Sequence, residues 1–146
     1  MTTALSGKEV GAKLDEKFPG SIVESSQDSL LVGSEFLLPV ATYLKDTPGL
    51  DFNYLTSITA VDYLDYFEVV YHLTSLEHNH SLVMKTRFYG RDNPRLPSVV
   101  SLWRAAEFQE REAYDLLGIS FDGHPNMKRI FLWEGFEGYP LRRDYL

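Results

Sequence analysis

Three strand-like segments, 55–63, 67–76 and 82–89, follow one another with no helix between them, and this cluster limits the possible folds most. They are rich in the β-branched and aromatic residues that favour strands. Every second residue from Phe67 to Leu73 is large and apolar or aromatic, which predicts a sheet with one covered face. The polar stretch 77–81 predicts a hairpin turn between the last two segments.

Two helices and a further hairpin are predicted ahead of these strands. In segment 7–18, apolar residues recur at i, i+4 and i+8 on one helix face, and Ser6 is a suitable N-cap. Short apolar runs on either side of a polar stretch predict a β-hairpin within 22–32. A second helix is expected after Ser34, as its cap, and it must begin or bend at Pro39.

A long helix is predicted over 99–117, after a loop at 90–97. Ser98 is its expected N-cap, and Gly118 is its expected left-handed C-terminal residue. Little regular periodicity follows Gly118, so the remaining residues are expected to be irregular.

The order helix, two strands, helix, three strands, helix groups the strands instead of alternating them with helices. This order predicts an α+β fold, a two-layer sandwich of helices on a mixed or antiparallel sheet. The 146 residues are of a size that forms one domain. Within it we expect an α+β body over residues 1–118 and an irregular, partner-docking C-terminal segment over residues 119–146.

The sequence contains no cysteine, which excludes disulfides, a thiol nucleophile, thiolate zinc sites and cysteine-ligated iron–sulfur clusters within it. No apolar run approaches the ~18 residues that indicate a membrane-spanning helix. The first residues lack the apolar core of a signal peptide. We therefore expect a cytoplasmic location or an equivalent compartment.

The net charge of −7 argues against nucleic-acid binding, which needs a basic face against phosphate. The charge is unevenly distributed: residues 1–84 contain 4 Lys or Arg against 12 Asp or Glu, whereas residues 85–146 contain 10 against 9. The second part is also dense in aromatic residues near its end. Aromatic residues and arginine are enriched at protein interfaces, so this part is the expected docking side.

Glu110 shares a face of the 99–117 helix with apolar residues, where a carboxylate is costly unless it is paired or hydrogen-bonded. Two interpretations remain open for it and its charged neighbours Arg111 and Asp115. They form surface pairs worth about 0.3–0.5 kcal/mol each, or they are buried, within the fold or against a partner. Buried, they would fix geometry more than they add stability.

An enzymatic interpretation of the same residues is a small hydrolase, with Glu110 and either Glu112 or Asp115 as an acid–base pair. Two observations argue against it. Glu110 and Glu112 are two residues apart and point to different helix faces, and Arg111 would keep neighbouring carboxylates ionised, which is wrong for a general acid.

The histidines give no metal-ligand spacing. His78 and His80 fall in the predicted 77–81 turn, where solvated polar residues are expected. His124 lies between Gly123 and Pro125, and it is expected to donate a hydrogen bond to a carbonyl or carboxylate and so lock its loop. No catalytic, cofactor-binding or metal-binding residue is therefore assigned.

The second half contains a long ordered set of motifs. They are the run Glu110 to Ile119, then Phe121, Gly123-His124-Pro125, Lys128-Arg129-Ile130 and Pro140 to Tyr145, with Pro97-Ser98-Val99 ahead of the helix. Together they resemble the signature of the C subunit of respiratory complex I, the 30-kilodalton-subunit family of NADH-quinone oxidoreductase.

The resemblance implies a peripheral-arm subunit of a proton-translocating complex that has no catalytic centre and binds no cofactor itself. Its implied partners are the large quinone-site subunit and the small iron–sulfur subunit, and the iron–sulfur clusters, flavin and quinone belong to partner subunits. It also implies a hetero-oligomer that meets the membrane only through the complex, on its cytoplasmic side or the equivalent stromal or matrix side. The motif residues, expected at interfaces or in loop locking, are Glu110, Arg111, Glu112, Asp115, Gly118, His124, Pro125, Arg129, Arg142, Arg143 and Asp144.

The electron donor stays open at this point, since NADH and ferredoxin both occur as donors in such complexes. The main alternative is the equivalent subunit of a related membrane-bound hydrogenase or coenzyme-linked dehydrogenase. The others are a free adaptor protein that recruits a partner through its C-terminal segment, and the small carboxylate-dependent hydrolase.

Overall fold

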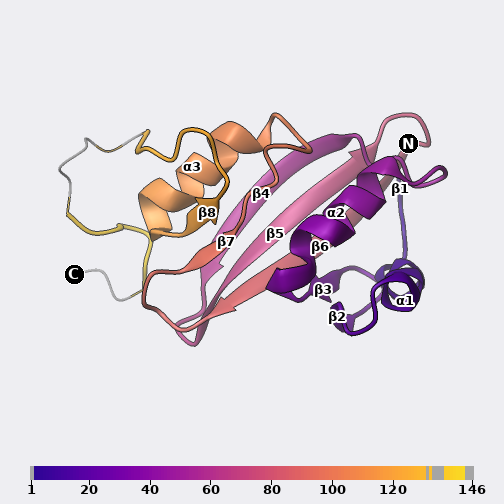
Figure 1. The fold of residues 1–146 in the computed structure, drawn as a ribbon, viewed down its shortest axis with the longest axis horizontal. Coiled ribbons are helices and arrows are strands. Elements are labelled where there is room, and N and C mark those ends of the chain that lie inside the picture. The colour runs from indigo at the N-terminus through magenta and orange to yellow at the C-terminus, as the bar shows by residue number, and fades with distance from the viewer. Residues whose placement is uncertain (1, 131, 133–136, 144–146) are drawn as a thin grey trace.

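The computed structural model describes residues 2–130, 132 and 137–143, and the course of the chain is shown in Figure 1. Its elements in chain order are β1 (Thr3–Ala4), α1 (Gly7–Lys17), β2 (Ile22–Ser25), β3 (Leu30–Val32), the 3-10 turn η1 (Ser34–Phe36), α2 (Leu37–Asp46), β4 (Tyr54–Asp62), β5 (Tyr66–Ser75), β6 (His80–Tyr89), β7 (Arg95–Pro97), α3 (Ala106–Leu117) and β8 (Ser120–Asp122).

The centre of the fold is a six-stranded mixed sheet, which confirms the predicted α+β class. Strands β2, β3, β6, β5 and β4 lie side by side in this order, and β1 pairs with β6. The long strands β4, β5 and β6 are antiparallel, while β1 and β3 run parallel to β6. Phe67 pairs with Phe88 and Tyr71 with Met84, so the predicted alternation fixes the register of the sheet centre.

One hydrophobic core joins the helices to the sheet, and α2 and α3 lie in front of the sheet in Figure 1. It contains Val40 and Leu44 of α2, Ala113 and Leu117 of α3, and the alternating apolar residues of β5. The helices therefore cover one face of the sheet, as a two-layer sandwich requires.

The first part of the chain follows the sequence closely. Ser6 caps α1 by accepting a hydrogen bond from the N–H of Glu9 at 3.4 Å, and β2 and β3 form the predicted hairpin. The expected cap at Ser34 is wrong, because this residue lies within η1, whose N-cap is Gly33. Helix α2 begins at Leu37, which places Pro39 in the first turn, where a missing N–H does no harm.

Helix α3 begins at Ala106, so the expectation of a helix from residue 99 capped by Ser98 is wrong. The preceding segment forms turns, in which the backbone N–H of Trp103 donates to the carbonyl oxygen of Val99 at 3.0 Å, and two tertiary contacts also fix it. The indole N–H of Trp103 donates to the carbonyl oxygen of Phe52 at 2.9 Å, and the N–H of Val99 donates to the Glu110 carboxylate. Gly118 ends α3 with φ of 80°, as predicted.

Three short strands were not predicted: β1, which pairs with β6, and the pair β7 and β8. Strand β7 lies in the expected loop and pairs in parallel with β8, which lies inside the segment expected to be irregular from residue 119. Ile119 and Phe121 are buried in the core, so residues 119–122 belong to the body of the fold. The irregular part begins only after them, at Gly123, and its described residues (123–130, 132 and 137–143) are called the tail below.

Candidate functional site

Glu110 is fully buried in the middle of α3, and both of its carboxylate oxygens are occupied. Oε1 accepts from the hydroxyl of Ser98 at 2.6 Å, and Oε2 accepts from the N–H of Val99 at 2.9 Å. Burial raises the pKa of this carboxyl to about 7, against the lowering effect of the two hydrogen bonds. The carboxylate thus holds the segment that leads into α3, and it has no access to solvent.

Asp115 is also fully buried, one turn further along α3, and it holds the tail. Its Oδ2 accepts from the backbone N–H groups of Ile130 and Leu132, each at 3.1 Å. Nη1 of Arg129 lies 3.5 Å from its Oδ1. Burial of Glu110 and Asp115 favours the second of the two interpretations, and neither carboxylate can act on a substrate in solution. The geometry therefore does not support an acid–base pair on α3.

Arg111 and His124 bind backbone carbonyl groups. The Arg111 guanidinium donates to the carbonyl oxygens of Lys128 at 3.1 Å and Arg129 at 3.2 Å, and it lies 3.7 Å from the carboxylate of Glu107. The N–H of Asn126 donates to Nδ1 of His124, so the ring proton is on Nε2, which donates to the carbonyl oxygen of Glu107 at 2.8 Å. This ring contact is the loop-locking hydrogen bond expected from the sequence.

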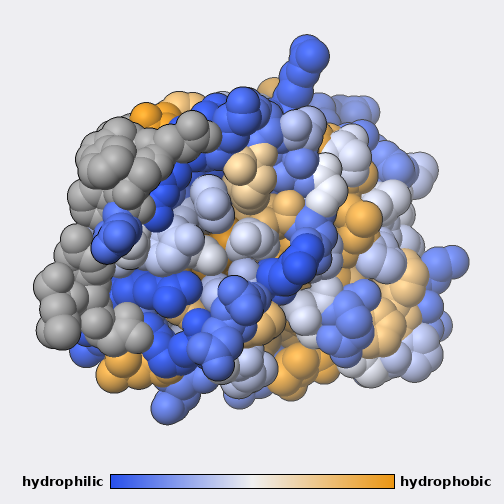
Figure 2. Space-filling model, turned by 60° about the vertical axis from the view of Figure 1, so that its left-hand side comes forward, coloured by the Kyte–Doolittle hydropathy of each residue, from blue (hydrophilic) through white to orange (hydrophobic). Residues whose placement is uncertain are grey.

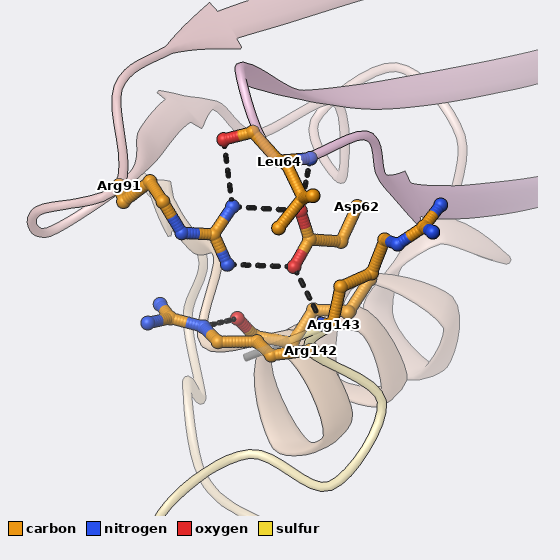
Figure 3. Close-up of polar contacts among 6 residues, drawn as sticks. Asp62, Leu64, Arg91, Arg142 and Arg143 are labelled. Carbon is orange, nitrogen blue, oxygen red and sulfur yellow. Dashed lines mark hydrogen bonds and ion pairs between the residues drawn. The ribbon is translucent and has the colours of Figure 1, made fainter. Parts of the chain in front are cut away.

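Asp62, at the end of β4, joins three distant parts of the chain (Figure 3). Its two oxygens each accept a hydrogen bond of 2.7 Å from the guanidinium of Arg91. It also accepts from the backbone N–H groups of Leu64 and Arg143, each at 2.8 Å. These hydrogen bonds, with that of Arg91 the largest cause, hold the pKa of Asp62 far below its usual range.

Sequence reasoning missed Asp62 and Arg91. The two residues are 29 positions apart, and Asp62 and Arg143 are 81 positions apart. No local pattern joins them. The only signal available was a carboxylate at the end of a strand with a covered face.

Gly118 allows the tail to approach the end of α3. A Cβ atom here would lie 2.7 Å from both the Arg142 guanidinium and the Tyr139 ring. Nε of Arg142 donates to the carbonyl oxygen of Leu117 at 2.6 Å, while Nη2 of Arg129 donates to that of Gly138 at 2.8 Å. These contacts fasten the last described residues to the C-terminal end of the helix.

The remaining motif residues are not part of this set of contacts. Glu112 is partly exposed and lines a groove between α3 and β4, to which Leu141 also contributes. Pro125 is exposed beside His124, and the side chain of Arg143 is exposed beyond the Asp62 cluster. Asp144 lies outside the described residues.

The prediction of solvated turn histidines is wrong for His80. It is buried, its Nε2 lies 2.8 Å from the carbonyl oxygen of Leu50, and its ring contacts that of Phe52. His78 is partly exposed and lies 2.7 Å from the carboxylate of Asp51. Ligand-type atoms of Asp51, Glu77 and His78 lie within 4.8 Å of one another. The sequence could not indicate this group because Asp51 comes from a different loop.

The profile of the family described as "Respiratory-chain NADH dehydrogenase, 30 Kd subunit" matches residues 30–146, which include the whole set of tail contacts. The chain therefore belongs to this family of respiratory-complex subunits.

Relatives in the family are named as C subunits of NADH-quinone oxidoreductase. The chain is 40% identical to the C subunit of Roseiflexus castenholzii, over 97% of this chain and 84% of the relative. It is 42% identical to that of Moorella thermoacetica, over 91% of this chain and 90% of the relative. It is 43% identical to a Rhizobium etli C subunit, over 81% of this chain. The match covers only 64% of that relative's length.

A solved structure has the same fold with a TM-score of 0.76 and 27% sequence identity, covering 95% of this chain and 85% of the other. It comes from the membrane-bound sulfane sulfur reductase, an archaeal respiratory membrane complex. In the described part of this chain, no helix has the length and apolar character needed to cross a membrane.

Proposed function

We propose that this chain is a peripheral subunit of a proton-translocating NADH- or ferredoxin-quinone oxidoreductase. In this role it has no catalytic centre and no cofactor of its own. It packs against the large quinone-site subunit and the small iron–sulfur subunit and keeps them in register, so that electrons pass to quinone. The iron–sulfur clusters, flavin and quinone lie in the partner subunits.

The observation that carries this proposal is how the motif residues are used. Asp115, Arg111 and Arg129 bind the tail, and Asp62 binds the tail to the sheet. These charged groups, which are of the types that a reaction would use, thus bind the tail to the helix and the sheet. The described tail contains Arg129, Tyr139, Arg142 and Arg143, and such a segment, held in place before association, is suited to docking because little entropy remains to be lost.

A second candidate is the equivalent subunit of a different membrane-bound respiratory complex. The likeness to a chain of the sulfane sulfur reductase favours it, because that complex is named for a different acceptor from quinone. The identities of 40–43% to the quinone-linked relatives are higher than this 27%, so we prefer the quinone-linked complex.

The location follows from the partners. A subunit of this kind is held at the membrane surface by the complex, on the cytoplasmic side or on the corresponding stromal or matrix side. The charge pattern supports this placement: the acidic first part of the chain suits exposure to solvent, and the basic aromatic part suits association.

The test is purification of the intact assembly from its own membranes through an affinity tag on this chain, followed by mass spectrometry. We expect an iron–sulfur subunit and a quinone-site subunit in stoichiometric amounts, and quinone reduction by the purified assembly. Comparing NADH with reduced ferredoxin identifies the donor, and comparing quinone with sulfane sulfur separates the two candidates. Recovery of the chain alone, or with unrelated proteins only, would favour a free adaptor and refute the proposal.

A further inference from the structure

Three arginines and two aromatic rings alternate in a ladder that joins the tail to the sheet. The guanidinium carbons of Arg91 and Arg142 lie 5.1 and 5.2 Å from the centre of the Phe67 ring. Those of Arg142 and Arg129 lie 4.9 and 4.8 Å from the centre of the Tyr139 ring. Arg142 is therefore the middle cation, in contact with both rings. Cation–π contacts of this kind hold a guanidinium in place without neutralising it.

The outer two cations have carboxylates, whereas the middle one has none among the residues that the structure describes. Arg91 makes a bidentate pair with Asp62, and Arg129 pairs with Asp115. The only hydrogen bond of Arg142's side chain to a described residue runs from Nε to the carbonyl oxygen of Leu117. Figure 3 shows that the two terminal nitrogens of Arg142 carry no dashed line and point away from Asp62.

Arg142 lines a groove of about 600 Å³ between the 91–95 loop and the tail. Among its described lining residues are Arg91, Arg95 and Arg142 but only one carboxylate, that of Asp92. Arg95 already pairs with Asp122 at 2.6 Å. This end of the molecule comes forward in Figure 2, which shows hydrophilic side chains gathered beside the grey atoms. Arg142 is thus the arginine of this lining that has no carboxylate partner among the described residues.

We infer that this groove binds a carboxylate side chain of a partner subunit, an Asp or Glu that forms a bidentate pair with the terminal nitrogens of Arg142. The guanidinium fork matches the geometry of a carboxylate, and stacking on two rings has already fixed its orientation. Arg142 has no carboxylate partner among the described residues, and the anionic side chains that a partner subunit can offer it are those of Asp and Glu. This inference rests on the proposed function, since it assigns a contact to the docking side.

The first test uses the intact assembly purified from native membranes with Arg142→Gln, Arg142→Lys and, as a matched control, Arg104→Gln. Arg104 is an exposed arginine outside the groove, so its substitution removes the same charge. We expect R142Q to lower recovery of the partner subunits about tenfold, as loss of one charge-assisted bidentate pair predicts, and R142K to lower it less. R104Q should leave recovery unchanged.

Normal recovery with R142Q would overturn this inference while leaving the proposed function intact. Failure of the unsubstituted chain to recover any partner would overturn both. Equal losses with R142Q and R104Q would assign the effect to net charge and also overturn the inference.

The second test asks which anion the groove takes, with the purified full chain and arginine side-chain NMR signals as the readout. The probes are blocked oligoglutamate, blocked oligoglutamine of equal length, and inorganic phosphate. We expect oligoglutamate to shift the Nε–H signal of Arg142, oligoglutamine to leave it unchanged, and R142Q to weaken oligoglutamate binding about tenfold. R104Q should bind as the unsubstituted chain does. Tighter binding of phosphate than of oligoglutamate would refute the carboxylate assignment.

Discussion

The backbone N–H of Arg143 donates to Oδ2 of Asp62 at 2.8 Å, and this bond ties the tail to the end of β4 across 81 positions of the chain. The same carboxylate oxygen accepts from Nη2 of Arg91 at 2.7 Å. Asp62 thus connects the sheet, the loop that follows β6 and the tail.

Substitution of this carboxylate by an amide, Asp62→Asn, removes the buried charge that pairs with the guanidinium of Arg91. Breaking such a pair by removing one partner costs about 3–5 kcal/mol. We expect urea denaturation to show a loss of stability of this order. A matched control is Asp65→Asn, which alters an exposed carboxylate three residues away, and it should change stability by less than about 0.5 kcal/mol. Equal effects of the two substitutions would contradict the role assigned to Asp62.

The pKa of Asp62 lies far below its usual range, so its stabilisation has a defined pH dependence. A carboxyl with a lowered pKa in the folded state stabilises the fold above the pKa it has in the unfolded chain, which is about 3.9. This contribution is lost as the pH falls through that value toward the lower pKa of the folded state. We therefore expect D62N to be less sensitive to acid than the unsubstituted chain below about pH 4. Acid unfolding followed by circular dichroism measures the difference.

Glu110 has the opposite dependence, because burial raises its pKa to about 7 from the ordinary value of 4.5. Between these two values the folded chain binds more protons at this residue than the unfolded chain. Its contribution to stability therefore falls as the pH rises, by roughly 1.4 kcal/mol for each unit of pKa difference. Glu110→Gln removes this slope, which urea denaturation at pH 5, 6, 7 and 8 would reveal. If the free energy of unfolding depended on pH in the same way for E110Q and the unsubstituted chain, the raised pKa of Glu110 would be refuted.

Asp115→Asn should loosen the tail without unfolding the body. The substitution removes the ion pair with Arg129 and weakens two hydrogen bonds from backbone N–H groups. We expect faster hydrogen exchange at Ile130 and Leu132, by about tenfold or more, with little change in the strands β5 and β6. A uniform increase across the chain would indicate global destabilisation instead.

Gly118→Ala should disturb the same region through sterics alone. Position 118 has φ of 80°, a conformation that costs an L-residue about 1–2 kcal/mol, and the added Cβ would lie 2.7 Å from Tyr139 and Arg142. We expect a stability loss of at least this size, together with faster proteolysis of the tail. Gly20→Ala is the matched control, since Gly20 has φ of 83° and no described atom lies within 4 Å of an added Cβ. It should show the conformational cost while leaving the tail protected.

The sequence by itself determined the elements whose patterns are local. β-Branched and aromatic residues predicted β4, β5 and β6, and period-two alternation predicted that β5 has one covered face. A serine cap at Ser6 and a left-handed glycine at Gly118 predicted two helix ends, because these residue types satisfy backbone groups within one turn. An acidic residue on an apolar stripe predicted that Glu110 needed hydrogen-bond partners, and its burial with two such partners confirms this.

Only the tertiary structure decided which groups those partners are. Helix α3 begins at Ala106, and the segment before it is held by the Glu110 carboxylate at Val99 and by the indole of Trp103 on the carbonyl oxygen of Phe52. The partners of Asp62 and the middle position of Arg142 between two rings likewise depend on segments far apart in the chain. Helix and strand patterns report on neighbours a few residues away, whereas the pairing of a buried charge depends on which segments the fold brings together.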